Sequence, residues 1–159
     1  LQNKKGHDAI PLRSQLILIF SLVDILSNYW FEFRGEGASQ RIRFCSWITE
    51  FCMTKKNPKY IGYWKAVSAQ RLYELRCSMV HFLGLSQASE GIYFALSPND
   101  YPESKRGEFS RKISKPGNKT IMLKPRHLHE LIRQGGMLML NSWQRMIKQA
   151  NKGSQEKRE

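Results

Sequence analysis

The feature that most constrains this chain is a series of apolar residues spaced three and four apart, the period of an amphipathic α-helix. The clearest stripe lies within residues 12–33 and comprises Leu16, Ile19, Phe20, Val23, Leu26 and Trp30, with Leu12 extending it backward. Pro11 suits the first turn of a helix, and Ser14 is an alternative cap. Gly35 and Gly37 follow within RGEGAS and are expected to end it. The pattern predicts a first helix over residues 12–33.

Three further stretches carry a helical pattern. Ser39 can cap a second helix that runs to about residue 52, and a third extends from Lys65 to about Phe82. A last helix begins near Pro125, and Gly135-Gly136 is expected to kink or interrupt it, because glycine disfavours a helix interior by about 1 kcal/mol. From residue 151 to 159 the chain is polar and is expected to be a disordered tail.

Between the third and last helices the pattern changes. Residues 91–96 and 119–123 are short runs that favour β-strands, and the polar segment between them is rich in proline, glycine and charge. We therefore expect a mainly all-α domain over residues 1–150. Its predicted architecture is a four-helix, up-and-down bundle with a small β-hairpin-like insertion at about 91–124, before the last helix.

Charge narrows the choice of partner. The 159 residues carry a formal net charge of +13, which favours polyanions such as nucleic acid or an acidic membrane surface. The excess falls in residues 34–65, 98–126 and 127–159, with net charges of +5, +5 and +3, whereas residues 1–33 and 66–97 are neutral. The basic residues thus concentrate in links, the polar arm and the last helix with its tail.

The stretch LYELRCSMVHFLGL, residues 72–85, holds the residues best suited to chemistry. Arg76 and His81 lie in an otherwise apolar helix end with four residues between them. Five helical steps rotate by about 140°, so the two converge only if the helix frays near His81 or both face a cleft shared with a partner chain. Otherwise Arg76 pairs with an acid and His81 caps the helix. Asp24, inside the apolar first helix, is a candidate partner for Arg76 in a buried structural ion pair.

An arginine, four to six residues and a histidine near the end of the third helix of a bundle resemble the HEPN superfamily. LYELRCSMVHFLG looks like the LY-x-LR-x-x-x-x-H form of bacterial members, and the resemblance extends over the helix order of residues 12–83 and 125–150. It implies metal-independent ribonuclease activity. The residue after the arginine is commonly Asn, Asp or His in active members and is Cys77 here, which favours a catalytically silent relative.

The resemblance also implies roles for these residues in a homodimer whose two-fold axis brings two Arg–His pairs to one cleft. His81 would act as general base or acid on the RNA 2′-hydroxyl or the leaving oxygen. Arg76 would bind the phosphate and offset its growing charge.

Two basic clusters are candidate phosphate contacts. The first is Lys55, Lys56 and Lys59 with Lys65, interleaved with Tyr60, Tyr63 and Trp64, which could stack on bases or instead plug the end of the bundle. The second lies in the polar arm and includes Lys105, Arg106 and Lys112, with Arg111 and Lys115. Such contacts hold a backbone without reading sequence.

No metal or cofactor site is expected. His127 and His129 diverge by about 200° on a helix, and no Cys pair or second carboxylate stands near them. The cysteines Cys45, Cys52 and Cys77 form no CxxC pair and suit a reducing compartment. The N-terminus lacks a signal-peptide pattern, and the run Leu16–Leu26 is shorter than a membrane span of ~20 residues. These features predict a cytoplasmic protein that does not associate with membranes.

Three functions remain open from the sequence. The first is a homodimeric HEPN-like protein that engages RNA and cleaves it with Arg76 and His81. The alternative is a catalytically silent HEPN-like module that binds nucleotide, RNA or protein. The third is an interaction protein whose basic surface meets an acidic protein.

Overall fold

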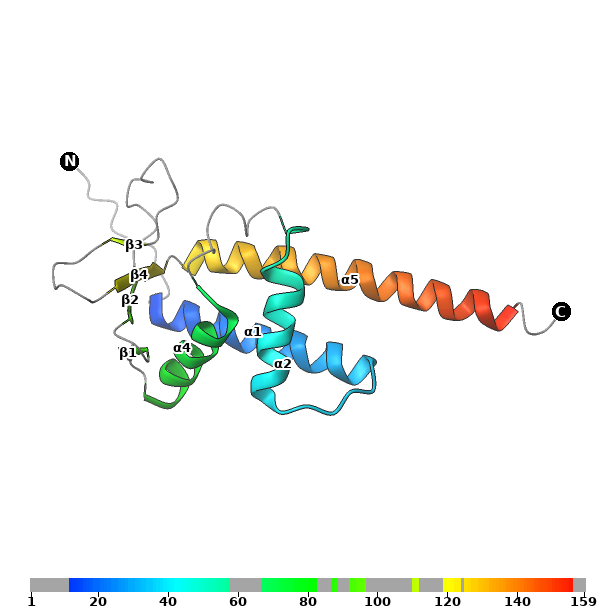
Figure 1. Ribbon diagram of the computed structural model, residues 1–159, viewed down its shortest axis with the longest axis horizontal. Helices are drawn as coiled ribbons and strands as arrows, with labels where there is room; N and C mark the ends of the chain where they lie inside the picture. Colours follow the sequence, from blue (N-terminus) through cyan, green and yellow to red (C-terminus); the bar gives the residue numbers. More distant parts are fainter. Residues whose placement is uncertain are drawn as a thin grey trace, which may run out of the picture.

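The computed structural model describes residues 12–57, 67–82, 87–88, 92–96, 110–111, 119–123 and 125–155. Of residues 12, 80–82, 154–155 and those in the strands, it describes the backbone alone. Its helices are α1 (Leu12–Phe33), α2 (Gln40–Trp47), the π-helical segment η1 (Ile48–Cys52), α4 (Ala69–Phe82) and α5 (Pro125–Gln155). The protein is mostly helical, as the sequence predicts (Figure 1).

The predicted bounds of the first two helices are confirmed, and the caps explain them. Gly35 has a φ of 66° and donates its N–H to the Glu32 carbonyl, while Glu36 donates to Phe31, so a Schellman motif ends α1. The Ser39 hydroxyl accepts the N–H of Ile42 and starts α2. Helix α2 continues without a break into η1, where Met53 N–H bonds to the Ile48 carbonyl.

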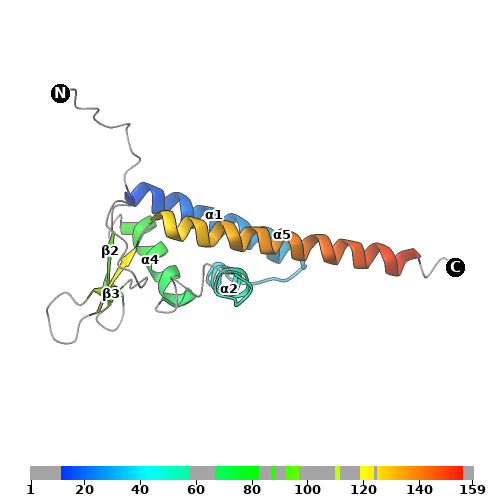
Figure 2. The same ribbon diagram turned by 90° about the horizontal axis from the view of Figure 1, so that it is seen from above.

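The helices do not form the expected up-and-down bundle. Helices α1 and α5 lie side by side and run in the same direction, since Gly136 neighbours Leu26 and Trp143 packs on Phe33 with ring centroids 4.7 Å apart. Helix α2 crosses this pair, and α2 and α4 lie on the same side of it (Figures 1 and 2). In an up-and-down bundle the first and last helices would be antiparallel neighbours. The crossing of α2 and η1 over α5 prevents that arrangement.

The core fills the space between these two layers. Its largest fully buried side chains come from each of the helices, and they are Trp47, Phe20, Phe44, Leu16, Ile48, Leu72, Leu75, Met79 and Leu128. Each apolar side chain buried in this way contributes about 1.5–3 kcal/mol to stability. Two polar bonds cross the core, from Trp47 Nε1 to Met139 Sδ (3.1 Å) and from Asn57 Nδ2 to the Leu131 carbonyl (3.2 Å). Both connect the α2–η1 helix to α5.

The β-favouring runs form strands, but they are not the two arms of a hairpin. The sheet has the order β1 (Gln87–Ala88), β2 (Ile92–Leu96), β4 (Lys119–Leu123) and β3 (Ser110–Arg111). Strands β2 and β4 pair in parallel, whereas β1 and β3 pair antiparallel on the outside. Two strands joined as a hairpin pair antiparallel, so the parallel pairing of β2 with β4 excludes the expected hairpin. The sheet lies at the end of the molecule where α1 and α5 begin (Figure 1).

Helix α5 differs from its prediction in two ways. It runs through Gly135-Gly136 without interruption and continues to Gln155, beyond the expected end at residue 150. Its last turns project past the other helices (Figure 2). The glycine at 135 has a packing role instead: a Cβ there would lie 2.6 Å from Cys52 Sγ and 3.3 Å from the Trp47 ring. Glycine therefore permits η1 to approach α5 closely.

Helix α1 lies at the centre of the domain and packs against α2, α4 and α5. By length and composition it is also the one described helix that could cross a membrane. Its inner face is buried in the core. A core helix of a soluble protein passes the same test of length and hydropathy, so this property does not identify a membrane protein.

The close approach at Gly135 generates a prediction. Gly135→Ala should lower the free energy of unfolding by about 1–3 kcal/mol, because overpacking outweighs the gain in helix propensity. Gly136→Ala is the control, since its Cβ would meet only Leu26 at an ordinary 3.7 Å, and it should stabilise by about 0.5–1 kcal/mol. Urea unfolding of both variants measures the difference. Equal stabilisation by the two alanines would contradict the close crossing.

Candidate functional site

Arg76 belongs to the buried face of α4. Leu72, Leu75 and Met79 place this face against the core, and Arg76 itself is 9% exposed. Its Nε and Nη2 groups both donate to Asp24 Oδ2, at 3.0 and 2.8 Å. The predicted pairing of Arg76 with Asp24 across the bundle is confirmed.

The rest of the guanidinium is also engaged. Nη1 lies 4.0 Å from Cys77 Sγ, and the Arg76 guanidinium lies over the Tyr73 ring at 5.9 Å from its centroid. Burial by itself lowers the pKa of Arg76, but the hydrogen bonds and charge of Asp24, helped by Cys77, outweigh it and raise the pKa above its ordinary value. Arg76 is therefore a permanent cation held in one orientation by α1.

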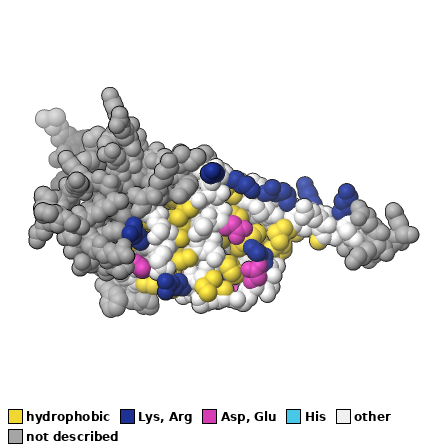
Figure 3. All heavy atoms as spheres, viewed as in Figure 1, with side chains coloured by type: hydrophobic (Ala, Val, Ile, Leu, Met, Phe, Trp, Pro, Cys, Tyr) yellow, Lys and Arg dark blue, Asp and Glu magenta, His cyan; other side chains and the backbone are white. Residues whose placement is uncertain are grey.

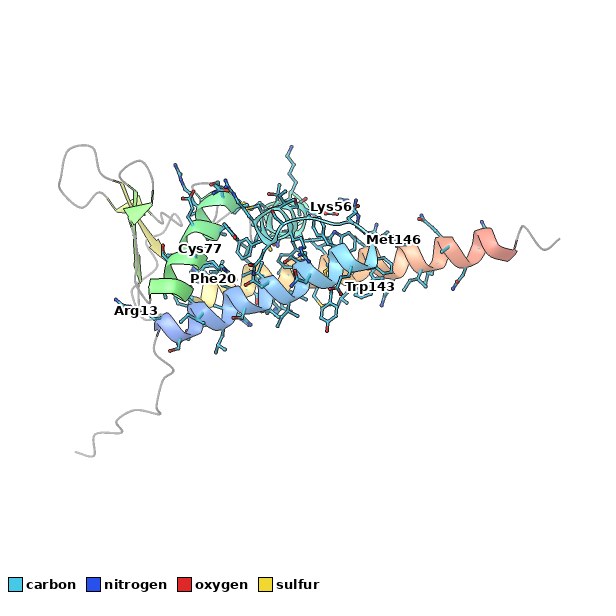
Figure 4. All side chains as sticks on the ribbon, turned by 90° about the horizontal axis from the view of Figure 1, so that it is seen from below. Arg13, Phe20, Lys56, Cys77, Trp143 and Met146 are labelled. Atoms are coloured by element: carbon cyan, nitrogen blue, oxygen red, sulfur yellow. The ribbon has the colours of Figure 1, made fainter. Side chains whose placement is uncertain are left out.

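Tyr73 shares this environment. Burial, together with its hydrogen bond to Cys77, raises the pKa of the Tyr73 hydroxyl above its ordinary value. The phenol thus stays protonated at neutral pH. Asp24 Oδ1 is buried and has no hydrogen-bond partner among the described residues. The cluster of Asp24, Tyr73, Arg76 and Cys77 connects α1 to the middle of α4 (Figure 4, where Cys77 is labelled).

His81 lies in the same helix, five positions after Arg76. Helix α4 runs to Phe82, so its backbone does not fray before His81, and the two positions remain about 140° apart around the helix. The His81 side chain lies outside the described residues. The sequence leaves two ways for Arg76 and His81 to come together. Fraying of the helix near His81 is wrong, because α4 continues to Phe82. A cleft shared with a partner chain stays a prediction.

The predicted basic residues are only partly described. Lys55 and Lys56 are exposed just after η1, and Lys56 lies on the side away from α1 (Figure 4). Lys59, Lys105, Arg106 and Lys112 lie outside the described residues, as do the aromatic side chains at positions 60, 63 and 64.

Sequence reasoning missed a basic stripe on α5. Arg145, Lys148 and Lys152 are exposed at intervals of three and four residues, so they share one face of the projecting helix. Arg145 follows Gly136 by nine residues, and Lys152 follows Trp143 by nine residues, where Gly136 and Trp143 face α1. Nine residues make two and a half helical turns, so both basic residues are half a turn around the helix from those positions. Figure 3 shows Lys and Arg side chains along this edge of α5, beginning near the end of η1. We call Lys55, Lys56, Arg145, Lys148 and Lys152 the basic edge. The three-and-four spacing of the charges was the signal available in the sequence.

Two surface hollows lie among the described residues, and neither is lined by Arg76. One, of about 380 Å³, lies between the ends of α1 and η1 and the projecting part of α5; Trp30, Arg34, Glu50 and Arg145 contribute to its walls. The other, of about 350 Å³, lies between the first turns of α1 and α5 and includes Leu18 and His129.

Within the described part of the chain, no three His, Cys, Asp or Glu side chains lie close enough to hold a metal ion. Cys45, Cys52 and Cys77 are free thiols. Burial raises the pKa of the Cys45 and Cys52 thiols above their ordinary value. Buried protonated thiols behave as small apolar side chains.

Comparison of the chain with protein-family models, with curated proteins and with solved structures found no match. The site must therefore be interpreted from its own geometry.

The Asp24–Arg76 pair yields a prediction about stability. Asp24→Ala should lower the free energy of unfolding by about 3–5 kcal/mol, because it leaves the Arg76 charge buried without a partner. The double variant Asp24→Leu/Arg76→Met should recover much of this loss, since both charges are then absent. Arg133→Ala, which breaks an exposed ion pair with Glu130, is the control and should cause no resolvable change. A stable Asp24→Ala protein would mean that the pair does not hold α4 to α1.

Proposed function

We propose that this protein is a HEPN-like RNA-binding module that holds RNA along its basic edge and does not cleave it. The observation that carries the proposal is the basic edge itself. Five exposed Lys and Arg side chains follow one side of the molecule, and no acidic side chain interrupts the stripe on α5 from residue 145 to 152. Phosphate backbones bind such surfaces by releasing counterions.

The dimensions suit a nucleic-acid strand. Residues 131–152 of α5 extend over roughly 30 Å at 1.5 Å per residue, and Asn57 connects the segment after η1 to the Leu131 end. The basic edge could therefore contact several consecutive phosphates. The charges of the polar arm, with Lys105, Arg106 and Lys112, and of Lys59 would add to the same electrostatic attraction. Contacts of this kind hold RNA independently of its sequence.

The state of Arg76 favours binding without cleavage. A guanidinium that stabilises a phosphorane must offer its N–H groups to the phosphate oxygens. Here two of those groups donate to Asp24 and a third faces Cys77, and the residue is 9% exposed. Binding a phosphate would require breaking a buried ion pair. We infer that Arg76 acts as a structural cation.

A second function has one observation in its favour. Helix α4 carries Arg76 in its middle and His81 near its C-terminal end, with the spacing found in HEPN ribonucleases. In this alternative a dimer cleft would bring two Arg–His pairs together, with His81 as general acid or base. Three free cysteines accord with a cytoplasmic location for either function.

The RNA-binding proposal is tested by salt dependence. The logarithm of the affinity for single-stranded RNA should fall linearly with the logarithm of salt concentration, and Lys148→Gln/Lys152→Gln should reduce that slope by about 1.4, or ~0.7 per lost contact. Arg41→Gln/Arg126→Gln removes the same charge from exposed positions outside the basic edge and is the matched control. Fluorescence anisotropy at several salt concentrations measures both. Equal slopes in the two double variants would overturn the placement of RNA on this edge.

Cleavage is tested separately. Labelled RNA incubated with the purified protein should remain intact, with and without EDTA, because Arg76 is committed to Asp24. Gel analysis of the RNA after prolonged incubation checks this. Cleavage in EDTA that leaves 2′,3′-cyclic phosphates and disappears in His81→Ala would instead establish the ribonuclease. DNA and 2′-methoxy RNA, which lack the 2′-hydroxyl nucleophile, should bind and survive in either case.

A further inference from the structure

The side of the α1–α5 pair opposite the core carries an exposed apolar stripe. On α1 it consists of Leu18, Leu22, Ile25 and Tyr29, spaced four, three and four residues apart, with Leu18 61% and Tyr29 57% exposed. Met137, Leu140 and Ile147 of α5 are also exposed; Met137 and Leu140 are level with the stripe, and Ile147 lies farther along α5, past the end of α1. Helices α2 and α4 pack on the other side of the pair (Figure 2), and no described residue covers this one. Figure 4 shows side chains projecting from α1 away from α2.

The size of this surface points to a protein partner. From their exposed fractions, the seven side chains present on the order of 700 Å², more than the ~300–600 Å² of the largest patch on a typical monomer. A standard stable interface takes about 800 Å² from each partner. The surface is therefore about large enough, with its polar rim, for one stable contact.

The charge pattern also fits a second copy of the chain. Within α1 the charged residues are Arg13, Asp24 and Glu32, and Asp24 is directed inward to Arg76. Between Leu18 and Tyr29 the outer side of α1 presents only apolar side chains with Ser21 and Asn28. Two molecules that each carry +13 repel one another elsewhere, whereas the α1 part of this surface places no like charges opposite one another; Arg126 of α5, which lines a hollow with Leu18, lies at its rim.

The spacing of the stripe is self-complementary. The intervals four, three, four are the same in both directions, so an antiparallel copy of α1 places Leu18 opposite Tyr29 and Leu22 opposite Ile25. A two-fold interface requires that residue i meets j while j meets i, and this stripe satisfies the requirement. We propose that two copies of this chain associate through the outer faces of α1, packed antiparallel, with the exposed apolar residues of α5 flanking the contact.

This interface does not involve α4. Asp24, which binds Arg76, lies on α1 at about 160° from Leu22 and about 100° from Ile25, on the basis of 100° per residue. Dimerisation through α1 thus leaves the two Arg76 clusters apart, and it leaves the basic edge of each copy open to RNA. The proposal does not depend on RNA binding, and the two can fail separately.

The test uses a charge exchange across the proposed two-fold axis. Leu22→Lys and Ile25→Glu should each raise the dimer dissociation constant by roughly 100-fold or more, because each places charges at two symmetry-related points of an apolar contact. Mixed together, the two variants should form a heterodimer, since the introduced lysine then faces the introduced glutamate while Ile25 meets Leu22. Ile42→Glu, at an isoleucine of α2 that is 54% exposed, is the matched control and should leave the dimer intact.

Sedimentation velocity of nuclease-treated protein at about 0.5 M salt measures the masses, because screening at that salt suppresses association through bound RNA while apolar contact persists. Circular dichroism checks that each variant is folded. A monomeric wild-type protein would overturn the proposal. If the mixed Leu22→Lys and Ile25→Glu variants stay monomeric, the antiparallel register is excluded, which also overturns it. A monomeric wild type that floats with phosphatidylserine-containing vesicles, and loses this with Ile25→Glu, would assign the face to lipid.

Discussion

The arrangement of this domain depends on the close crossing of the α2–η1 helix over α5. Gly135 allows Cys52 and Trp47 to approach the α5 backbone more closely than any side chain would permit. The bond from Trp47 to Met139 and the bond from Asn57 to the Leu131 carbonyl lie on either side of that point. Because the crossing is steep, α2 cannot run back along α1. The first and last helices therefore become parallel neighbours, and their shared outer side is left without a covering helix.

The same arrangement decides what Arg76 can do. Helix α4 packs on α1 where Asp24 interrupts the apolar core, and a buried carboxylate requires a partner. Arg76 supplies it with two charge-assisted bonds, and Tyr73 and Cys77 surround the remainder of the guanidinium. Arg76 therefore joins α4 to α1 through a buried ion pair. The sequence by itself does not distinguish this structural role from the catalytic role considered above, because both place an arginine at the same position of an apolar helix.

Two surfaces of opposite character result. In the basic edge, Lys148 and Lys152 lie on the projecting part of α5 and Arg145 lines the hollow at the end of α1, whereas the apolar stripe lies on the outer side of α1. The α1 part of the apolar stripe contains none of the residues of the basic edge, so the two proposals, RNA binding and association of two copies, use different residues. This separation arises from α5, whose inner positions at 136 and 143 face α1 while Arg145 and Lys152 lie half a turn away.

The approximate positions of the helices, both ends of α1, the cap that starts α2 and the pairing of Asp24 with Arg76 followed from the sequence. Local periodicity, Gly35, Ser39 and Pro125 act within a few residues, and an acid and a base placed in apolar stripes have few other partners. Helix direction, the parallel pairing of β2 with β4, the π-helical segment η1 and the role of Gly135 did not follow. They depend on contacts between residues far apart in the chain, such as Cys52 with Gly135, which no local pattern encodes. Gly135, which weakens a helix when considered alone, becomes necessary once another helix crosses it. What the sequence determined by itself is therefore the set of amphipathic helices and their charges, because these depend on neighbours within one or two turns. Only the tertiary structure decided which faces were buried and which were left open, because that choice depends on how closely the backbones of distant helices can approach.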